Sequence, residues 1–95
     1  MRLTIYDTYR IIIKSRSSYR VEKDQFDEEL SETVIHNMTY DQVSKFINEK
    51  ATDEYACELE IVDNIVRIEG FNPTTGEDYT YNMEILKELE EEKEM

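Results

Sequence analysis

The chain has 95 residues and carries 23 acidic against 11 basic side chains, a net charge of −12 at pH 7. A chain of this length forms one folded domain with one small core, because small domains bury only about 60% of the surface that their unfolded chains expose. The apolar content of 39%, with seven tyrosines, exceeds that of a disordered acidic tail, so we expect one folded domain over residues 1–95.

Signals for export or membrane insertion do not stand out in the sequence. The longest purely apolar run is Ile11–Ile13, whereas a membrane-spanning helix needs roughly 20 residues. The first residues have no apolar central stretch of the kind that a signal peptide contains. Cys57 is the one cysteine, so an intramolecular disulfide is excluded. These features predict a cytoplasmic protein without a membrane partner.

Alternation near the N-terminus predicts a β-hairpin. Apolar and aromatic residues recur at every second position from Tyr9 to Ile13, and again from Tyr19 onward. The serine-rich break between them, Ser15–Ser18, resembles a turn. We therefore expect an antiparallel hairpin over residues 9–23.

Two patterns overlap in residues 24–37. Phe26, Leu30 and Val34 recur every four residues, as on one side of a helix. The β-branched run that begins at Thr33 favours a strand instead. We expect a short helix that gives way to an extended piece near Thr33, with the choice between helix and strand left open.

The central helix has the clearest sequence signals. Thr39 is a good N-cap, and Gln42 stands three residues later, which is the spacing of a capping box. Met38 and Val43 occupy the two positions of a hydrophobic staple. The sequence therefore predicts a helix from about Tyr40 to Lys50.

Residues 55–82 are typical of a three-stranded antiparallel meander. Asp63 and Asn64 fit a two-residue hairpin turn, and Asn72–Gly76 fits a second turn. The first turn sets a register with Ile61 opposite Val66, Leu59 opposite Ile68, Cys57 opposite Gly70, Glu60 opposite Arg67 and Glu58 opposite Glu69. The last of these pairs places like charges opposite each other, which destabilises the pairing.

A short apolar stripe near the C-terminus predicts a final helix from about Asn82. We expect it to fray after about Glu90, because acidic side chains oppose the dipole at the C-terminal end of a helix. The expected fold is thus α+β, with the N-terminal hairpin and the meander packed against the central helix. Its predicted core contains Ile11, Ile13, Val21, Val43, Phe46, Ile47, Cys57, Leu59, Ile61, Val66, Ile68 and Leu86.

The chain offers few groups for catalysis or cofactor binding. Nucleophilic catalysis would have to rest on Cys57 and the one histidine, His36. Gly70 and Gly76 are isolated, so they do not form a phosphate-binding loop. Acidic residues near Asp24 have neither the spacing nor the central glycine of an EF-hand. We expect a protein that is not an enzyme and that has no cofactor and no metal.

Acidic rows are the candidate binding surface. Carboxylates two residues apart on a strand lie roughly 7 Å apart, and DNA carries one charge per about 3.4 Å on each strand, so such rows resemble a row of phosphates. Tyrosines beside them would supply packed anchors. The candidate partner-binding residues are Asp24, Asp27, Glu28, Glu32, Glu58, Glu60, Glu69, Tyr79 and Tyr81.

The charge is divided unevenly along the chain. Residues 1–23 carry six basic and two acidic side chains, whereas the remainder carries 21 acidic and five basic ones. The basic segment suggests direct nucleic-acid binding, but the net charge opposes it, and the segment also complements the acidic remainder within the fold or across a homodimer. The acidic excess itself indicates either a need for solubility or a positively charged partner.

In size, acidity, lack of catalytic residues and α+β pattern, the chain resembles small phage-encoded inhibitors of host defence, the anti-CRISPR and anti-restriction proteins of the DNA-mimic type. The resemblance implies a non-enzymatic inhibitor in the host cell cytosol. Such a protein binds the basic nucleic-acid-binding groove of a CRISPR nuclease or a similar defence enzyme. The alternative is a small acidic structural or regulatory interaction module whose contact surface is the tyrosine-rich face of the sheet. A homodimer is one form of this alternative.

Overall fold

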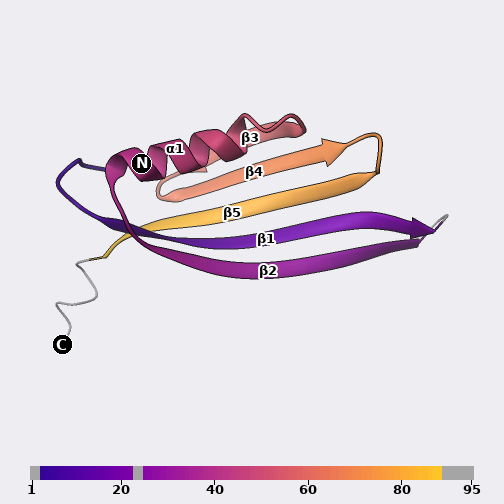
Figure 1. Cartoon of the computed structure of the whole chain (residues 1–95), viewed down its shortest axis with the longest axis horizontal. Helices are drawn as coiled ribbons and strands as arrows, with labels where there is room; N and C mark the ends of the chain where they lie inside the picture. Colours follow the sequence, from indigo (N-terminus) through magenta and orange to yellow (C-terminus); the bar gives the residue numbers. More distant parts are fainter. Residues whose placement is uncertain (1–2, 23–24, 89–95) are drawn as a thin grey trace.

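The computed structural model describes residues 3–22 and 25–88 and consists of a five-stranded antiparallel sheet with one helix. The elements follow one another along the chain as β1 (Tyr9–Glu22), β2 (Gln25–Met38), α1 (Tyr40–Ala51), β3 (Ala56–Val62), β4 (Ile65–Asn72) and β5 (Glu77–Lys87). In the sheet the strands lie in the order β2-β1-β5-β4-β3, so β2 and β3 form its two edges (Figure 1). The predicted α+β class is confirmed.

β1 runs without a break through Ser15–Ser18, where the sequence predicted a turn. The strand lies between β2 and β5 and pairs with both; Ser15, for example, pairs with Ser31 on one side and Tyr81 on the other. Serine has only a weak local preference for turns, and pairing on both sides outweighs it. The predicted hairpin within residues 9–23 is therefore wrong, because all of β1 forms one arm of a longer hairpin with β2.

β2 is a strand from Gln25 to Met38, so the short helix expected before Thr33 is wrong. A spacing of four residues fits both structures, because it is close to one helical turn and is also a multiple of the strand period of two. Phe26, Leu30 and Val34 consequently share one face of β2, and all three are exposed.

α1 begins and ends almost where the sequence predicted. Thr39 Oγ1 accepts a hydrogen bond from the Gln42 N–H, and the Gln42 side chain accepts one from the Thr39 N–H, which completes the capping box. Both residues of the predicted staple, Met38 and Val43, are buried in the core. Within residues 3–22 and 25–88, no helix is both long enough and apolar enough to span a membrane.

β3, β4 and β5 form the predicted antiparallel meander, and Gly76 in the second turn has the expected positive φ of 77°. Four of the five expected pairs between β3 and β4 are present. The fifth is wrong, because an irregularity between Ala56 and Glu58 shifts the register and places Ala56 opposite Gly70. Cys57 is therefore exposed, although the sequence predicted it in the core.

β5 continues to Lys87, through the stretch where the sequence predicted a helix. Met83 and Ile85, two residues apart, are both buried on one face, which is the strand period. β5 pairs with β1 and β4, so its backbone N–H and C=O groups form hydrogen bonds to the neighbouring strands. The predicted C-terminal helix is wrong over residues 82–87, and the fraying expected after Glu90 lies outside the described residues.

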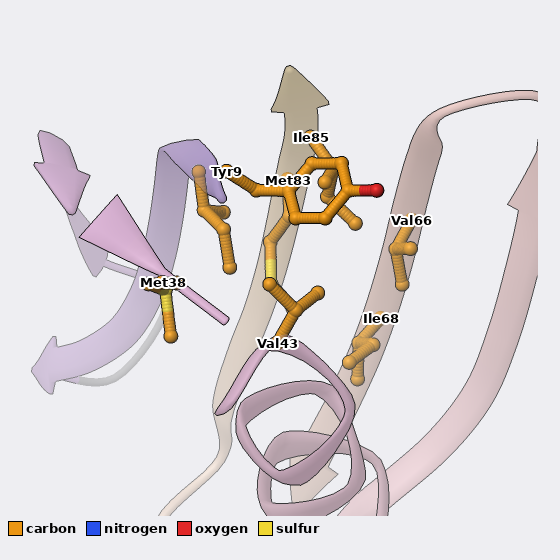
Figure 2. Close-up of a cluster of buried hydrophobic side chains, with 8 residues drawn as sticks. Tyr9, Met38, Val43, Val66, Ile68, Met83 and Ile85 are labelled. Atoms are coloured by element: carbon orange, nitrogen blue, oxygen red, sulfur yellow. The ribbon is translucent and has the colours of Figure 1, made fainter. Parts of the chain in front are cut away.

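The buried side chains gather on the face of the sheet that α1 covers. They are Tyr9, Ile11, Met38, Val43, Val66, Ile68, Met83 and Ile85. Figure 2 shows Val43 pointing from α1 toward Met83 of β5, with Val66 and Ile68 of β4 to one side. We call this side of the sheet the covered face and the opposite side the open face.

The predicted core is confirmed in part. Four of its residues are buried: Ile11, Val43, Val66 and Ile68. Four more are half-buried: Ile13, Phe46, Ile47 and Leu86. Val21, Cys57, Leu59 and Ile61 are exposed instead. Leu59 and Ile61 pair with the buried Ile68 and Val66, but they lie on the edge strand β3, which has a neighbouring strand on one side only.

Candidate functional site

The residues predicted as a partner-binding surface do not form one patch. They are distributed over four strands: Asp27, Glu28 and Glu32 on β2, Glu58 and Glu60 on β3, Glu69 on β4, and Tyr79 and Tyr81 on β5. Asp24 lies outside the described residues. β2 and β3 are opposite edges of the sheet, and with strands about 4.8 Å apart these edges are separated by roughly 19 Å.

The β2 acids on the open face lie beside basic side chains of β1. Glu28 forms a hydrogen-bonded ion pair with Arg16. Glu32 pairs directly with Lys14 across the two strands. Opposite charges at such positions attract each other, so β1 offsets part of the negative charge of these two carboxylates.

Glu58, Glu60 and Glu69 gather around Arg67 on the open face. Arg67 pairs with Glu60 across the strands, and its Nη2 lies 3.5 Å from a carboxylate oxygen of Glu69. Glu58 does stand opposite Glu69, as the sequence predicted. The adjacent guanidinium offsets part of the repulsion between them, so this pair belongs to a cluster of mixed charge.

A more acidic site lies on the covered face, beyond the end of α1. The far parts of β1 and β2 extend past the helix (Figure 1). A hollow of about 430 Å³ lies there, with carboxylates from Glu49 of α1, Asp53 after α1 and Glu77 of β5 in its lining. Ser17 of β1 and the rings of Tyr79 and Tyr81 also line it. We call this site the acidic hollow.

Tyr79 is held in the acidic hollow by three neighbours. Its hydroxyl donates a hydrogen bond of 2.7 Å to Asp53 Oδ2. Its ring lies directly on Gly70, the residue opposite it on β4, where a Cβ would stand 2.1 Å from the ring carbon Cζ. The Tyr81 ring is 5.5 Å away and tilted by 57°, a favourable arrangement for two aromatic rings. Tyr79 therefore has one defined position.

One cation already lies at the hollow and shows how its rings bind positive charge. The Lys50 ammonium is 5.2 Å from the centre of the Tyr81 ring and 5.5 Å from the centre of the Phe46 ring. Both distances lie within the range of cation–π attraction. The acidic hollow thus combines carboxylates with aromatic faces, the two groups that stabilise a cation.

Two acids of β2 extend the site on the covered face. Glu29 pairs with Ser17, which lines the hollow, and Asp27 pairs with Tyr19 one step further along β1. These cross-strand neighbours are uncharged, in contrast to Lys14 beside Glu32 on the open face. Asp27, Tyr79 and Tyr81 of the predicted site are therefore on one side of the sheet, together with Glu29.

Ionisation of Tyr79 and Asp53 is coupled through their hydrogen bond. Burial raises the pKa of the Tyr79 phenol above its ordinary value of 10.0, and the hydrogen bond to Asp53 raises it further. The same bond, followed by one from the Tyr55 N–H, lowers the pKa of Asp53 below 3.8. The site therefore holds a protonated phenol against a carboxylate over the whole neutral range.

Tyr79 is expected to make stability depend on alkaline pH. Its pKa is raised in the folded state, so its contribution is complete below the unfolded pKa near 10 and is lost as pH rises above that value. In an absorbance titration the last phenolate to form should disappear in Tyr79→Phe and persist in Tyr6→Phe, a change of a 90% exposed ring. An identical titration end for Tyr79→Phe and the parent protein would contradict this assignment.

Sequence reasoning missed the carboxylates of the acidic hollow, Glu49, Asp53 and Glu77. They come from three separate parts of the chain, and only the packing of α1 on the sheet brings them together. One signal was present, however. The turn at Asn72–Gly76 sets Gly70 opposite Tyr79, and a glycine facing a tyrosine across two strands is typical of an aromatic ring that covers a glycine.

Side chains that could bind a metal or act as nucleophiles are separated in the described part of the chain. Among the residues that the structure describes, no group of three or more His, Cys, Asp and Glu side chains converges as metal ligands would. His36 lies on β2, where it hydrogen-bonds to Glu88, and Cys57 lies on β3 at the opposite edge. The two residues considered for nucleophilic catalysis are thus far apart in the sheet.

Comparisons with known proteins add no relative to this description. No family model, no curated protein and no solved structure matches the chain.

Proposed function

We propose that the protein is a non-enzymatic inhibitor that binds a positively charged, nucleic-acid-binding surface of a partner protein. The observation that supports this proposal is the acidic hollow, which is lined by the carboxylates of Glu49, Asp53 and Glu77 together with Tyr79 and Tyr81. In this proposal the hollow receives a lysine or arginine side chain of the partner. Asp27 and Glu29 on β2 bind further basic side chains beside it.

The chemistry of the hollow suits an arginine in particular. A guanidinium forms paired hydrogen bonds with a carboxylate and stacks on an aromatic face. The hollow presents both groups, and Lys50 already places its ammonium over the Tyr81 ring. Pockets for drug-like ligands are mostly apolar, whereas this lining consists of residues with carboxylates, hydroxyls and an amide, together with Arg16 and Lys50.

The partner class follows from the charge that the site needs. Proteins that bind nucleic acid do so through clusters of lysine and arginine placed to meet phosphates. An acidic protein on such a cluster excludes the nucleic acid both sterically and electrostatically. We therefore propose a CRISPR nuclease or a similar defence enzyme as the target, and no direct binding of nucleic acid, which the net charge of −12 opposes.

Competition with nucleic acid tests this function. Partner proteins are captured from a bacterial lysate on the immobilised protein at low salt, and the complex is challenged with a short DNA duplex. We expect the duplex to displace the partner and binding to weaken steeply as salt is raised, because surface charges are screened. A partner that binds its DNA normally while saturated with this protein would contradict the proposal.

Two matched triple variants locate the surface. E29Q/E49Q/E77Q removes three charges at the acidic hollow, and E32Q/E58Q/E60Q removes three on the open face. We expect the first to weaken the complex by about tenfold or more, and the second by less than about threefold, since its carboxylates already lie beside Lys14 and Arg67. Equal losses of affinity in the two variants would mean that only the net charge matters. A larger loss for E32Q/E58Q/E60Q would mean that the partner binds the open face.

A further inference from the structure

The open face of the sheet carries apolar side chains that α1 does not cover. Val34 of β2, Val62 of β3 and Ile65 of β4 are 43%, 57% and 45% exposed. The pairings place these residues in one row across the sheet, in the order Val34, Ile12, Glu84, Ile65, Val62. A sheet ordinarily buries an apolar face against another layer, so we expect another element to cover this row.

The same face is the least acidic part of the surface. Of the eight basic side chains on described residues, five are on it: Arg10, Lys14, Arg16 and Arg20 of β1 and Arg67 of β4. Three of them are paired with acids: Lys14 stands opposite Glu32, Arg67 stands opposite Glu60, and Arg16 forms an ion pair with Glu28. The face therefore carries charges of both signs, although the chain as a whole is strongly negative.

We propose that the open face is a homodimer interface, in which a second copy of this chain packs its own open face against it. A two-fold axis parallel to the strands, above the boundary of β1 and β5, places β2 of one copy over β4 of the other. Residues in one row then meet. Val34 lies over Ile65 of the second copy, and Glu32 lies over Arg67 of the second copy. Each contact occurs twice.

Charge complementarity selects a second copy as the occupant. In this register the acidic Glu32 of β2 meets the basic Arg67 of β4 of the second copy, and the two-fold axis forms this charge pair twice. A uniformly basic partner would instead meet Lys14, Arg16, Arg20 and Arg67, which repel it. A pair that is formed twice in this way is a property of an isologous interface.

The area available predicts a weak, reversible dimer. Four overlapping strands about 4.8 Å apart and about eight residues of roughly 3.3 Å give a contact near 500 Å² in each copy, or about 1,000 Å² in total. This value lies just below the range of about 1,200–2,000 Å² that stable complexes bury. Repulsion between two chains of charge −12 opposes the dimer most at low salt. Added salt should therefore tighten it.

Sedimentation equilibrium with matched variants of one hairpin tests the interface. For the parent protein we expect a mass that rises with concentration from 11.4 kDa toward twice that value, and more readily at high salt. V62K/I65K places two lysines on the open face and should weaken the dimer by about tenfold or more. L59K/I61K changes two residues of similar exposure, 50% and 48%, on the covered face and should not weaken the dimer.

A charge swap then tests the register of the two copies. Glu32→Arg alone sets two positive groups over each other, and Arg67→Glu alone sets two negative ones, so each should weaken the dimer. The double variant E32R/R67E should restore it, because the pair is re-formed with opposite polarity. A parent protein that stays monomeric at every concentration and salt, or equal losses in the two lysine variants, would overturn the dimer. A double variant no better than the singles would overturn the proposed register.

The dimer and the proposed function fail independently. The dimer tightens with salt and is not weakened by E29Q/E49Q/E77Q, whereas binding of the basic partner weakens with salt and depends on those carboxylates. Loss of one behaviour with retention of the other identifies which proposal is wrong.

Discussion

Ile68→Ala is expected to lower the free energy of unfolding by about 3–4 kcal/mol, because it removes a large side chain from the centre of a small core. Ile68 is fully buried on the covered face, in the cluster that joins β4 and β5 to Val43 of α1 (Figure 2). The cost combines the lost burial of three carbons with the cavity left behind. For a domain of this size it is a large fraction of the total stability.

Ile65→Ala is the matched control, because it makes the same chemical change three residues earlier in the same strand. Ile65 is 45% exposed on the open face, so the substitution should cost less than about 1 kcal/mol. Both values come from urea unfolding followed by circular dichroism, at protein concentrations low enough to dissociate the proposed dimer. Similar costs for the two variants would mean that α1 does not cover the face that bears Ile68.

Gly70→Ala is expected to destabilise the protein by about 2 kcal/mol, although alanine ordinarily suits a strand better than glycine. The new Cβ would stand 2.1 Å from the Tyr79 ring, so the ring must leave its position. Tyr79 would then lose its 2.7 Å hydrogen bond to Asp53 and its packing against Tyr81. The loss arises from the displaced tyrosine, not from the alanine itself.

A double-mutant cycle separates these two causes. In a Tyr79→Ala background there is no ring to displace, so Gly70→Ala should become neutral or slightly stabilising. Gly76→Ala serves as a second control: there is open space around it, but its φ of 77° should cost about 1 kcal/mol whether Tyr79 is present or not. If Gly70→Ala costs the same in both backgrounds, the contact with Tyr79 is not its cause.

The acidic hollow was only partly predictable. Tyr79 and Tyr81, and Asp27 beside the hollow, were identified from tyrosine content and acidity, but the carboxylates of Glu49, Asp53 and Glu77 were not. Glu49 lies in the last turn of α1 and Asp53 follows the helix, so their distance from β5 depends on where the helix lies on the sheet. No pattern within the helix sequence specifies that position, whereas the opposition of Gly70 and Tyr79 follows from the turn between their strands.

Sequence by itself determined the elements whose signals are local. The capping box of Thr39 and Gln42 defines the start of α1, and the turn at Asp63 and Asn64 defines the pairing of β3 with β4 as far as Glu58. In both cases the deciding interactions lie within a few residues of each other, so the neighbouring sequence contains the whole cause.

Tertiary structure alone decided the state of β1, β2 and β5. The serines of β1 and the apolar residues near Met83 are compatible with a turn and a helix, and Phe26, Leu30 and Val34 suit a helix as well as a strand. Each of these segments became a strand because it pairs with a neighbour distant in the chain, as β1 does with β5. Backbone hydrogen bonds formed with such a neighbour outweigh local preferences of a few tenths of a kcal/mol, roughly, per residue.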